Sequence, residues 1–394
     1  MGNELLKKAF ELYPKMQDYR RYLHQNAEVG FALEKTKGFV EDCLTKLGYQ
    51  PKPCGRCGIT ADISAKRKGI FLLRADMDAL PIQEKTGEAF ACRLGNMHAC
   101  GHDMHVAMLL GAAEILGAYA PSLKKGVRLL FQPAEELLEG AQDCIDAGVL
   151  QGVDGAMMLH VLPNLPFPCG TAVVSAEGIS APAADFFKIT VSGKGCHGSS
   201  PWQGVDALLI AAKIVDDVQT IASREVSPQS PSVLTIGKMV AGDSGNVIAK
   251  KAVLSGSLRA MDGEVHAFLK ERMEKIAQGT AKAFRGTAKV KYEGGCPCLV
   301  NDRKLSDFVH QVCMDTLGKK RCLKSSDFPR GGLGGSEDFA YISQKVPSIM
   351  VGICAGERGQ VRDEALHSPR VQFDETALPY GAALLAAVAL RRSL

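Results

Sequence analysis

The sequence lacks an apolar run long enough to cross a membrane. Its longest run, around Gly381–Leu390, covers about half of the ~20 residues that a membrane-spanning helix requires, and predicts a buried helix instead. The N-terminal segment mixes acids and bases and has no apolar stretch of the secretory type, so no secretory signal is expected. An excess of one charge is also missing. Lys and Arg number 47 and Asp and Glu 43, a net charge of +4, which favours neither a nucleic-acid-binding nor a membrane-surface protein.

A regular cysteine pattern is missing as well. The 13 Cys are odd in number and irregularly spaced in a chain of 394 residues, which excludes a disulfide framework and predicts a reducing, cytoplasmic location. Two close pairs, Cys54 with Cys57 and Cys296 with Cys298, could suggest a structural zinc site. They lie far apart in the chain with no His clustered beside them, so this alternative is not favoured.

What the sequence does contain is a strand–helix alternation over its first half. Hydrophobic residues make up 46% of the chain, enough for sizeable cores and, at this length, for two or more domains. Short apolar strands at Ile70–Leu73, Val127–Phe131 and Gly155–His160 alternate with predicted helices at His105–Tyr119 and Glu135–Ala147. This alternation predicts an α/β unit with a largely parallel sheet.

The pattern changes near Ala181. From Asp185 to Tyr292 the predicted order is β-α-β-β-α-β, the order of a ferredoxin-like domain. Helix and strand then alternate again towards the C-terminus. We therefore expect one α/β domain in two pieces, residues 1–181 and 294–394, interrupted by an inserted α+β domain at residues 182–293.

The segment His98–His105, HACGHDMH, is the densest cluster of chemically active side chains. Cys100 and His102 flank a single glycine, so both can point at one centre if the segment is extended. Thiolate and imidazole are ligands for Zn²⁺, Co²⁺, Ni²⁺ or Mn²⁺. Two alternatives remain open: a polar helix start with an idle cysteine, and Cys100 as a nucleophile beside His102.

Further candidates follow the predicted strands of the first half. Asp76 and Asp78 follow one strand, Glu135 and Glu136 another, and His160 ends the next. The carboxyl edge of an open α/β sheet is where ligands bind, and adjacent carboxylates can divide metal binding and proton transfer between them. Taken singly, these residues have ordinary explanations as helix-dipole partners, turn residues or a hydrogen-bonded core histidine. Their collective position is the argument.

Four more residues complete the set of candidates. His367 could join the strand-end group, although alone it carries little weight. In the inserted domain, His197 stands in a Gly/Ser loop where it could donate to a developing oxyanion. Asn246 and Arg259 are candidate carboxylate binders.

Nine motifs in this order resemble the metal-dependent aminoacylase/carboxypeptidase amidohydrolases. The nearest branch holds hippurate hydrolases, auxin-conjugate hydrolases and N-acetyldiaminopimelate deacetylase. The motifs span nearly the whole chain: RRYLHQNAEVGF (Arg20–Phe31), RADMDALPI (Arg74–Ile82), MHACGHDMH (Met97–His105), FQPAEE (Phe131–Glu136), LHVLP (Leu159–Pro163), GKGCHGSSP (Gly193–Pro201), AGDSGNVI (Ala241–Ile248), GSEDF (Gly335–Phe339) and LHSP (Leu366–Pro369).

The resemblance implies a zinc-peptidase-like catalytic domain with an inserted ferredoxin-like domain that serves as lid and dimer interface. It also implies two divalent metal ions per chain, Mn²⁺, Zn²⁺, Co²⁺ or Ni²⁺. Cys100 would bridge them, His102 and His160 would complete one metal, and Glu136 and His367 the other.

The resemblance assigns the remaining roles as well. Glu135 would be the general base that later returns its proton to the leaving amine, and Asp76 would orient a ligand. His197 would bind the oxyanion, in its own chain or across a homodimer, while Asn246 and Arg259 would bind the free carboxylate.

The reaction implied is hydrolysis of an N-acyl amino acid to a carboxylic acid and a free amino acid. A dipeptidase or carboxypeptidase of the same mechanism, and a non-catalytic binding protein on the same fold, are the alternatives. Two departures from the family's usual loop, Cys196 and Trp202, leave the shape of the acyl pocket open.

Overall fold

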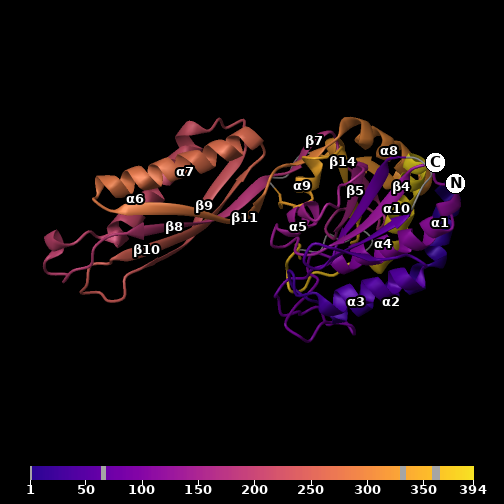
Figure 1. Cartoon of the computed structure of the whole chain (residues 1–394), viewed down its shortest axis with the longest axis horizontal. Helices are drawn as coiled ribbons and strands as arrows, with labels where there is room; N and C mark the ends of the chain where they lie inside the picture. The colour runs from indigo at the N-terminus through magenta and orange to yellow at the C-terminus, as the bar shows by residue number, and fades with distance from the viewer. Residues whose placement is uncertain (1, 64–67, 329–333, 357–363) are drawn as a thin grey trace. The chain divides into compact units, whose positions relative to one another are not determined.

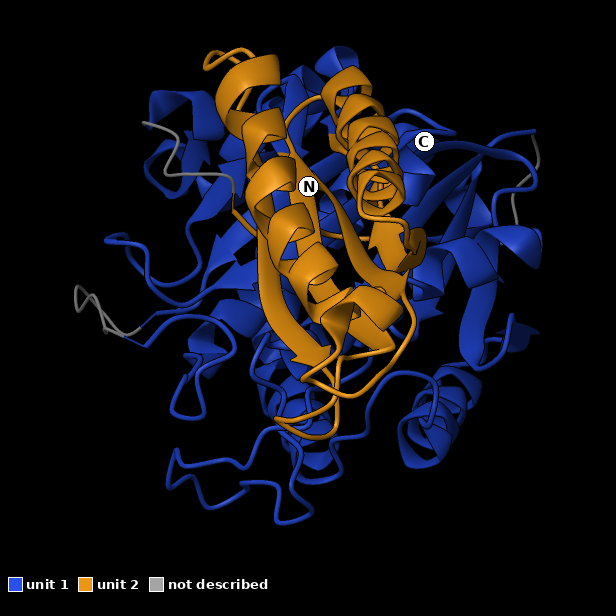
Figure 2. Cartoon of the chain, turned by 90° about the vertical axis from the view of Figure 1, so that its left-hand side faces the viewer, with its two compact units in different colours: residues 1–180, 300–330, 341–394 blue, residues 181–299, 331–340 orange. Residues whose placement is uncertain are grey.

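The computed structural model describes residues 2–63, 68–328, 334–356 and 364–394. The chain divides into two compact units, coloured separately in Figure 2. Unit 1 comprises Met1–Ser180, Val300–Arg330 and Tyr341–Leu394, and unit 2 comprises Ala181–Leu299 and Gly331–Ala340. The first crossing lies beside the expected boundary at residue 181. The second lies six residues beyond the expected one, because the last strand of unit 2 runs on to Cys296.

Unit 1 is built on a mixed eight-stranded sheet with the order β1-β2-β4-β3-β5-β14-β6-β13. Its four central strands, β4, β3, β5 and β14, are mutually parallel, as expected, while β1, β2 and β6 add antiparallel pairs. The strand bounds are β1 Lys52–Cys54, β2 Gly58–Ile63, β3 Ile70–Asp76, β4 Gly126–Gln132, β5 Val153–Leu162, β6 Ala172–Val174, β13 Cys322–Lys324 and β14 Ser348–Cys354. Two short strands, β7 Gly178–Ala181 and β12 Leu299–Asn301, form a separate pair.

Helices α4 and α10 form the centre of the helical layer of unit 1 and pack on each other and on β3. Both are apolar on nearly every side and almost wholly buried, as predicted for the C-terminal run. The helices of unit 1 are α1 Gly2–Glu11, α2 Tyr13–Gln25, α3 Glu34–Lys46, α4 His102–Gly117, α5 Gly140–Asp146, α8 Arg303–Leu317 and α10 Leu378–Ser393, with a single turn, α9 Ala340–Ser343 (Figure 1).

The predicted helix at 135–147 is wrong in its first third, because α5 begins only at Gly140. Ala134 and Leu138 have φ angles of 52° and 55°, in the left-handed region that interrupts a right-handed helix. Glu135 and Glu136 therefore lie on an irregular turn between β4 and α5. The sequence pattern does not predict this turn, because neither Ala134 nor Leu138 is of a residue type that favours a left-handed conformation.

Unit 2 folds around its own apolar core. Its strands are β8 Ala183–Ser192, β9 Ser232–Ala241, β10 Lys251–Ala260 and β11 Thr287–Cys296, and its helices are α6 Ala207–Thr220 and α7 Gly263–Ala283. The sheet order β11-β8-β10-β9, with every pair antiparallel, is that of the ferredoxin-like arrangement expected from the sequence. Asp206 and Asp262 begin the two helices by accepting backbone N–H groups, as good N-caps do.

The structure also bears on two expectations from the sequence, the lack of a membrane-spanning helix and the lack of disulfides. Among the described residues, no helix combines the length and the apolar character needed to traverse a bilayer. All thirteen cysteines are free thiols, and twelve of them are buried.

Gly101, the N-cap of α4, generates the first prediction. Its φ is +83°, and a Cβ at this position would lie 2.3 Å from Cγ2 of Val161 on β5. Gly101→Ala should lower the free energy of unfolding by about 1–3 kcal/mol, through a strained backbone and overpacking. Gly38→Ala is the matched control: Gly38 lies inside α3 with nothing within 4 Å of its Cβ position, so it should gain about 0.5–1 kcal/mol. Urea unfolding of both variants measures the two values. Equal stability of the Gly101 variant and the wild type would contradict the packing described.

Candidate metal centre and active site

The ends of three parallel strands determine where the site lies. In the sheet register, Asp76 of β3 pairs with Gln132 of β4, and Arg74 of β3 pairs with Met158 of β5. Asp76 and His160 each lie two residues beyond the paired Arg74 and Met158, so they are at about the same level of the sheet. The turn carrying Glu135 and Glu136 leaves β4 at this edge, and all these side chains consequently gather at one carboxyl edge of the sheet.

The first group of potential metal ligands is Cys100, His102 and His160, whose donor atoms lie within 4.8 Å of one another. Cys100 Sγ is 3.4 Å from His160 Nε2. Two ligands bound about 2.0–2.3 Å from a tetrahedral metal ion lie about 3.3–3.8 Å apart, so this distance fits donors to one cation.

The second group is Cys100, Glu136 and His367, again within 4.8 Å. Glu136 Oε1 lies 3.3 Å from His367 Nε2. His367 has a left-handed φ of 67°, and its N–H donates to Ala99 O at 3.0 Å, which ties it to the Cys100 segment. Cys100 is common to both groups. The structure thus brings together all five residues that the sequence proposed as ligands, and Cys100 is the residue that the two groups share.

Backbone carbonyls orient two of the imidazoles. His102 Nδ1 lies 2.8 Å from Asp78 O, and His160 Nδ1 lies 2.8 Å from Val161 O. A ring nitrogen facing a carbonyl must carry a proton, so Nε2 is the atom of each imidazole that a cation could bind. Such partners fix the tautomer and direction of metal-binding histidines.

The chemistry of the donor set fits metal cations. His102 Nε2 is buried and has no hydrogen-bond partner in the described parts of the chain, yet it lies 3.7 Å from Asp76 Oδ2 and 3.9 Å from Glu135 Oε2. Burial alone would raise the pKa of Cys100, but His160 and His102 lower it to about 6, which favours the thiolate that metals bind. A nitrogen lone pair, a thiolate and carboxylates facing one another are satisfied together by cations.

Asp76 lies at the centre of a buried polar chain. It accepts from Arg74 Nη1 at 2.6 Å and from His105 Nδ1 at 2.5 Å, and His105 Nε2 in turn accepts from Val161 N at 2.9 Å. Burial would raise the pKa of Asp76, but Arg74, His102 and His105 hold it well below its usual range. Sequence reasoning alone gives His105 no role. Its spacing of three from His102 on α4, which places both on one helix face, was the available signal.

The substrate candidates of unit 2 fall into two separate places. His197 forms an antiparallel bridge with Val247, and Gly198 N donates to Asn246 O at 2.8 Å, so His197 and Asn246 lie on neighbouring loops. Arg259 lies near the other end of β10, where its Nη1 donates to Ser336 Oγ at 2.8 Å. The eight residue steps from Lys251 to Arg259 span about 26 Å of strand. The structure therefore does not bring Asn246 and Arg259 of one chain to one carboxylate.

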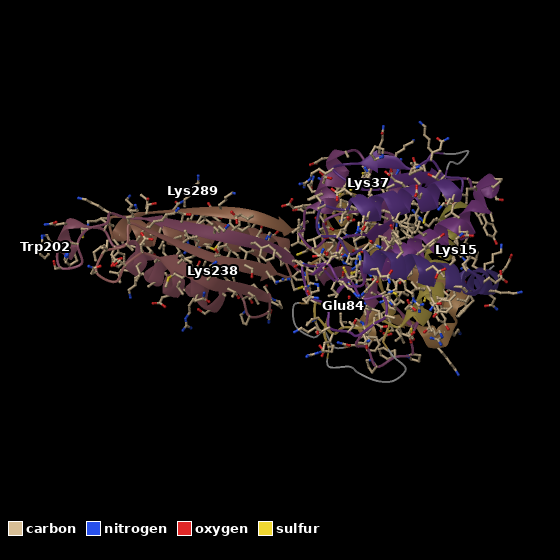
Figure 3. All side chains as sticks on the ribbon, turned by 90° about the horizontal axis from the view of Figure 1, so that it is seen from below. Lys15, Lys37, Glu84, Trp202, Lys238 and Lys289 are labelled. Atoms are coloured by element: carbon tan, nitrogen blue, oxygen red, sulfur yellow. The ribbon has the colours of Figure 1, made fainter. Side chains whose placement is uncertain are left out.

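Trp202 and Cys196 belong to the His197 loop. Trp202 is 70% exposed at the tip of unit 2 (Figure 3), and Cys196 Sγ donates to Ser200 O at 3.3 Å. Neither residue lies near Arg259 within unit 2.

Two residues of the N-terminal motif RRYLHQ bond to Asp103, the residue that follows His102 on α4. His24 Nδ1 lies 2.8 Å from Asp103 Oδ2 and its Nε2 lies 3.2 Å from Glu84, while Arg20 Nε donates to the same Asp103 oxygen at 2.9 Å. Burial would lower the pKa of His24, but the bonds to Asp103 and Glu84 outweigh it and raise the pKa to about 9. The protonated imidazole thus joins α2 to the residue that follows His102.

Comparison with known proteins places this geometry in context. The sequence model described as Peptidase family M20/M25/M40 matches residues 72–391. An N-acetyl-L-cysteine deacetylase of Bacillus subtilis is 38% identical over 388 residues, covering 96% of this chain and 90% of that protein. An IAA-amino acid hydrolase of Arabidopsis thaliana is 34% identical over 392 residues, covering 98% and 87%.

A solved structure of the same family also matches this chain. The Bacillus subtilis YXEP protein, described as a dinuclear metal binding peptidase, matches with a TM-score of 0.79 and 30% identity, over 97% of this chain and 98% of that one. This likeness confirms the predicted zinc-peptidase-like fold with an inserted domain.

His24 gives the prediction of this section. Its folded pKa of about 9 exceeds the ordinary value of 6.5, so its contribution to stability is complete below pH 6.5 and disappears as pH rises through 9. His24→Gln should lower the free energy of unfolding by about 3 kcal/mol at pH 6, with the difference from wild type shrinking towards pH 10. Denaturant unfolding from pH 6 to 10 measures this difference. His310→Gln, at a half-buried histidine whose pKa is lowered, is the control and should not show it. A difference for His24→Gln that stays constant with pH would contradict the prediction.

Proposed function

Because the chain belongs to peptidase family M20/M25/M40, we propose that it is a metal-dependent amidohydrolase. Its substrates are N-acyl amino acids, and its products are a carboxylic acid and a free amino acid. The observation that carries this proposal is the pair of donor groups sharing Cys100, with the carboxylate of Glu135 beside them. The names of relatives that remove acyl groups from amino acids support the substrate class.

The site would hold two divalent cations, drawn from Mn²⁺, Zn²⁺, Co²⁺ or Ni²⁺. Cys100 would be shared by both cations, His102 and His160 would hold one of them, and Glu136 and His367 would hold the other. Burial would raise the pKa of Glu136, but His367 and His102 lower it, which keeps this ligand ionised. When bound, such cations polarise the scissile carbonyl and ease the loss of a proton from water.

Glu135 carries the proton in this mechanism. It is 6% exposed, and its Oε2 faces His102 Nε2 at 3.9 Å. Its carboxylate takes a proton from the attacking water as the new C–O bond forms at the acyl carbon. The same proton then passes to the amine nitrogen as the C–N bond breaks, so one acid–base group serves both steps.

Unit 2 would supply the substrate contacts. Arg259, held by Ser336, would bind the free carboxylate of the amino acid, and His197 would stabilise the oxyanion. Since His197 and Arg259 lie at opposite ends of unit 2, we propose that they serve different sites in a homodimer. Exposed apolar side chains in unit 2 are consistent with a surface that a second copy covers: Trp202, Leu208, Leu209, Met239, Val240 and Val247. The thirteen free thiols support a cytoplasmic location.

Glu135→Gln tests the proposed function. N-acetyl, N-benzoyl and N-aminoacyl amino acids are offered to the purified protein with and without each of the four metals. Metal-dependent release of amino acid should appear, and kcat should fall roughly 10²–10⁴-fold in the variant, which keeps the size of the side chain but cannot accept the proton. Calorimetry should show that the variant still binds metal. Equal activity of metal-free and metal-loaded wild type would refute the proposal, and turnover confined to N-aminoacyl substrates would indicate a dipeptidase.

Subunit mixing tests the shared site. Glu135→Gln and His197→Ala homodimers should each be nearly inactive. If His197 serves the partner's Glu135, a random mixture of subunits restores one intact site in each heterodimer, about a quarter of wild-type activity overall. Co-expression with two affinity tags isolates the heterodimers. Inactive heterodimers would show that His197 acts within its own chain.

A further inference from the structure

The carboxylate of Asp78 accepts two consecutive backbone N–H groups. Its Oδ1 lies 2.9 Å from Glu135 N and its Oδ2 lies 3.2 Å from Glu136 N. Asp78 is only 1% exposed, in the segment that directly follows β3. One buried side chain thus holds the main chain at both adjacent glutamates.

The backbone of Asp78 makes a third connection. Its carbonyl accepts from His102 Nδ1 at 2.8 Å, the contact that directs His102 Nε2 away from the backbone. A single residue therefore bonds to three groups with separate tasks: a metal ligand at the start of α4, a second metal ligand on the β4–α5 turn, and the general base beside it.

The turn needs this support, because it is not helical. Ala134 and Leu138 are both left-handed and α5 begins only at Gly140, so the N–H groups of Glu135 and Glu136 have no intrahelical carbonyl as acceptor. Ala134 N donates to Gly30 O at 3.2 Å, and Ala134 O accepts from Gly140 N at 3.2 Å. These two bonds hold the ends of the turn. The Asp78 carboxylate holds its middle, where the two functional side chains leave the backbone.

We propose that Asp78 is a positioning residue that fixes the Glu135 carboxylate relative to Glu136 and His102. Both proton transfer and metal binding then depend on Asp78. The inference rests on the proposed function for the role of Glu135. Its effect on Glu136 and His102 concerns metal binding alone and can be measured without a substrate.

Asp78→Asn is the variant that tests the proposal. Asparagine has the same shape but only one acceptor oxygen, so its amide NH₂ must oppose one of the two N–H groups. The turn should shift, because two donors cannot face each other in a buried place. We expect a 10–100-fold fall in kcat with KM changed less than about threefold, and a 10–100-fold weaker affinity for added Co²⁺. The visible spectrum of the Co²⁺-loaded variant should also differ from that of the wild type.

Glu28→Gln is the matched control. The Glu28 carboxylate also accepts two consecutive N–H groups, from Lys35 at 3.2 Å and Thr36 at 2.9 Å, but these begin α3 rather than the catalytic turn. The control should lose a similar amount of stability while keeping wild-type kcat, Co²⁺ affinity and Co²⁺ spectrum. If Asp78→Asn fails to fold, Asp78→Ser replaces it, because serine accepts one N–H without bringing an amide donor.

The outcomes distinguish the positioning role of Asp78 from the proposed function. An Asp78 variant with wild-type kcat, Co²⁺ affinity and spectrum overturns the positioning role. The positioning role is also overturned if Glu28→Gln, at the same loss of stability, shows the same fall in kcat and Co²⁺ affinity, because both losses would then reflect folding alone. A wild type that turns over no substrate while Asp78→Asn still weakens Co²⁺ binding removes the proposed function but keeps the role of Asp78 at Glu136 and His102.

Discussion

The parallel register of β3, β4 and β5 is the constraint on which the rest of the site depends. Parallel neighbours must end on the same side of a sheet, so residues far apart in sequence meet at one edge. Asp76 and His160 lie at about the same level of that edge because of the register in which β3 pairs with β5. A slip of one residue would turn His160 from one face of the sheet to the other. The apolar runs that bury the strands therefore also determine which polar residues come together beyond them.

Burial then determines the chemistry of what has been gathered. Removing carboxylates and a thiol from water is unfavourable, and the structure offsets this with close partners: Arg74 and His105 for Asp76, and His160 and His102 for Cys100. The partners also fix which atom of each group faces inward. The orientation of the His102 ring is fixed, since its Nδ1–H donates to Asp78 O and its Nε2 lies among the carboxylates. A preorganised donor set needs little rearrangement when a cation enters, which is the physical basis of tight binding.

The sequence predicts most of this arrangement, and its failures have physical causes. Strands and helices follow from apolar periodicity, and the order of motifs leads to Cys100, His102, Glu136, His160 and His367. The helix predicted at Glu135 fails because two non-glycine residues adopt left-handed backbones, a tertiary effect that the bonds to Asp78 and Gly30 support. The structure separates Asn246 from Arg259 within one chain, for a different reason. Residue type suggests a shared carboxylate, but only the length of β10 reveals that it separates them.

The potential metal ligands and the proposed substrate contacts belong to different units of the chain. All five potential ligands, together with Glu135, Asp76 and Asp78, belong to unit 1 and lie at one edge of its sheet, beside its large apolar core. The proposed substrate contacts belong to unit 2, on a separate core. A change of acyl or amino-acid preference can then arise in the loops of unit 2, such as the one carrying Trp202, without disturbing the ligands. Changes behind the metal site act differently. In the proposed arrangement, Asp78 links Glu135 to both Glu136 and His102, so a change at Asp78 should affect proton transfer and metal binding together.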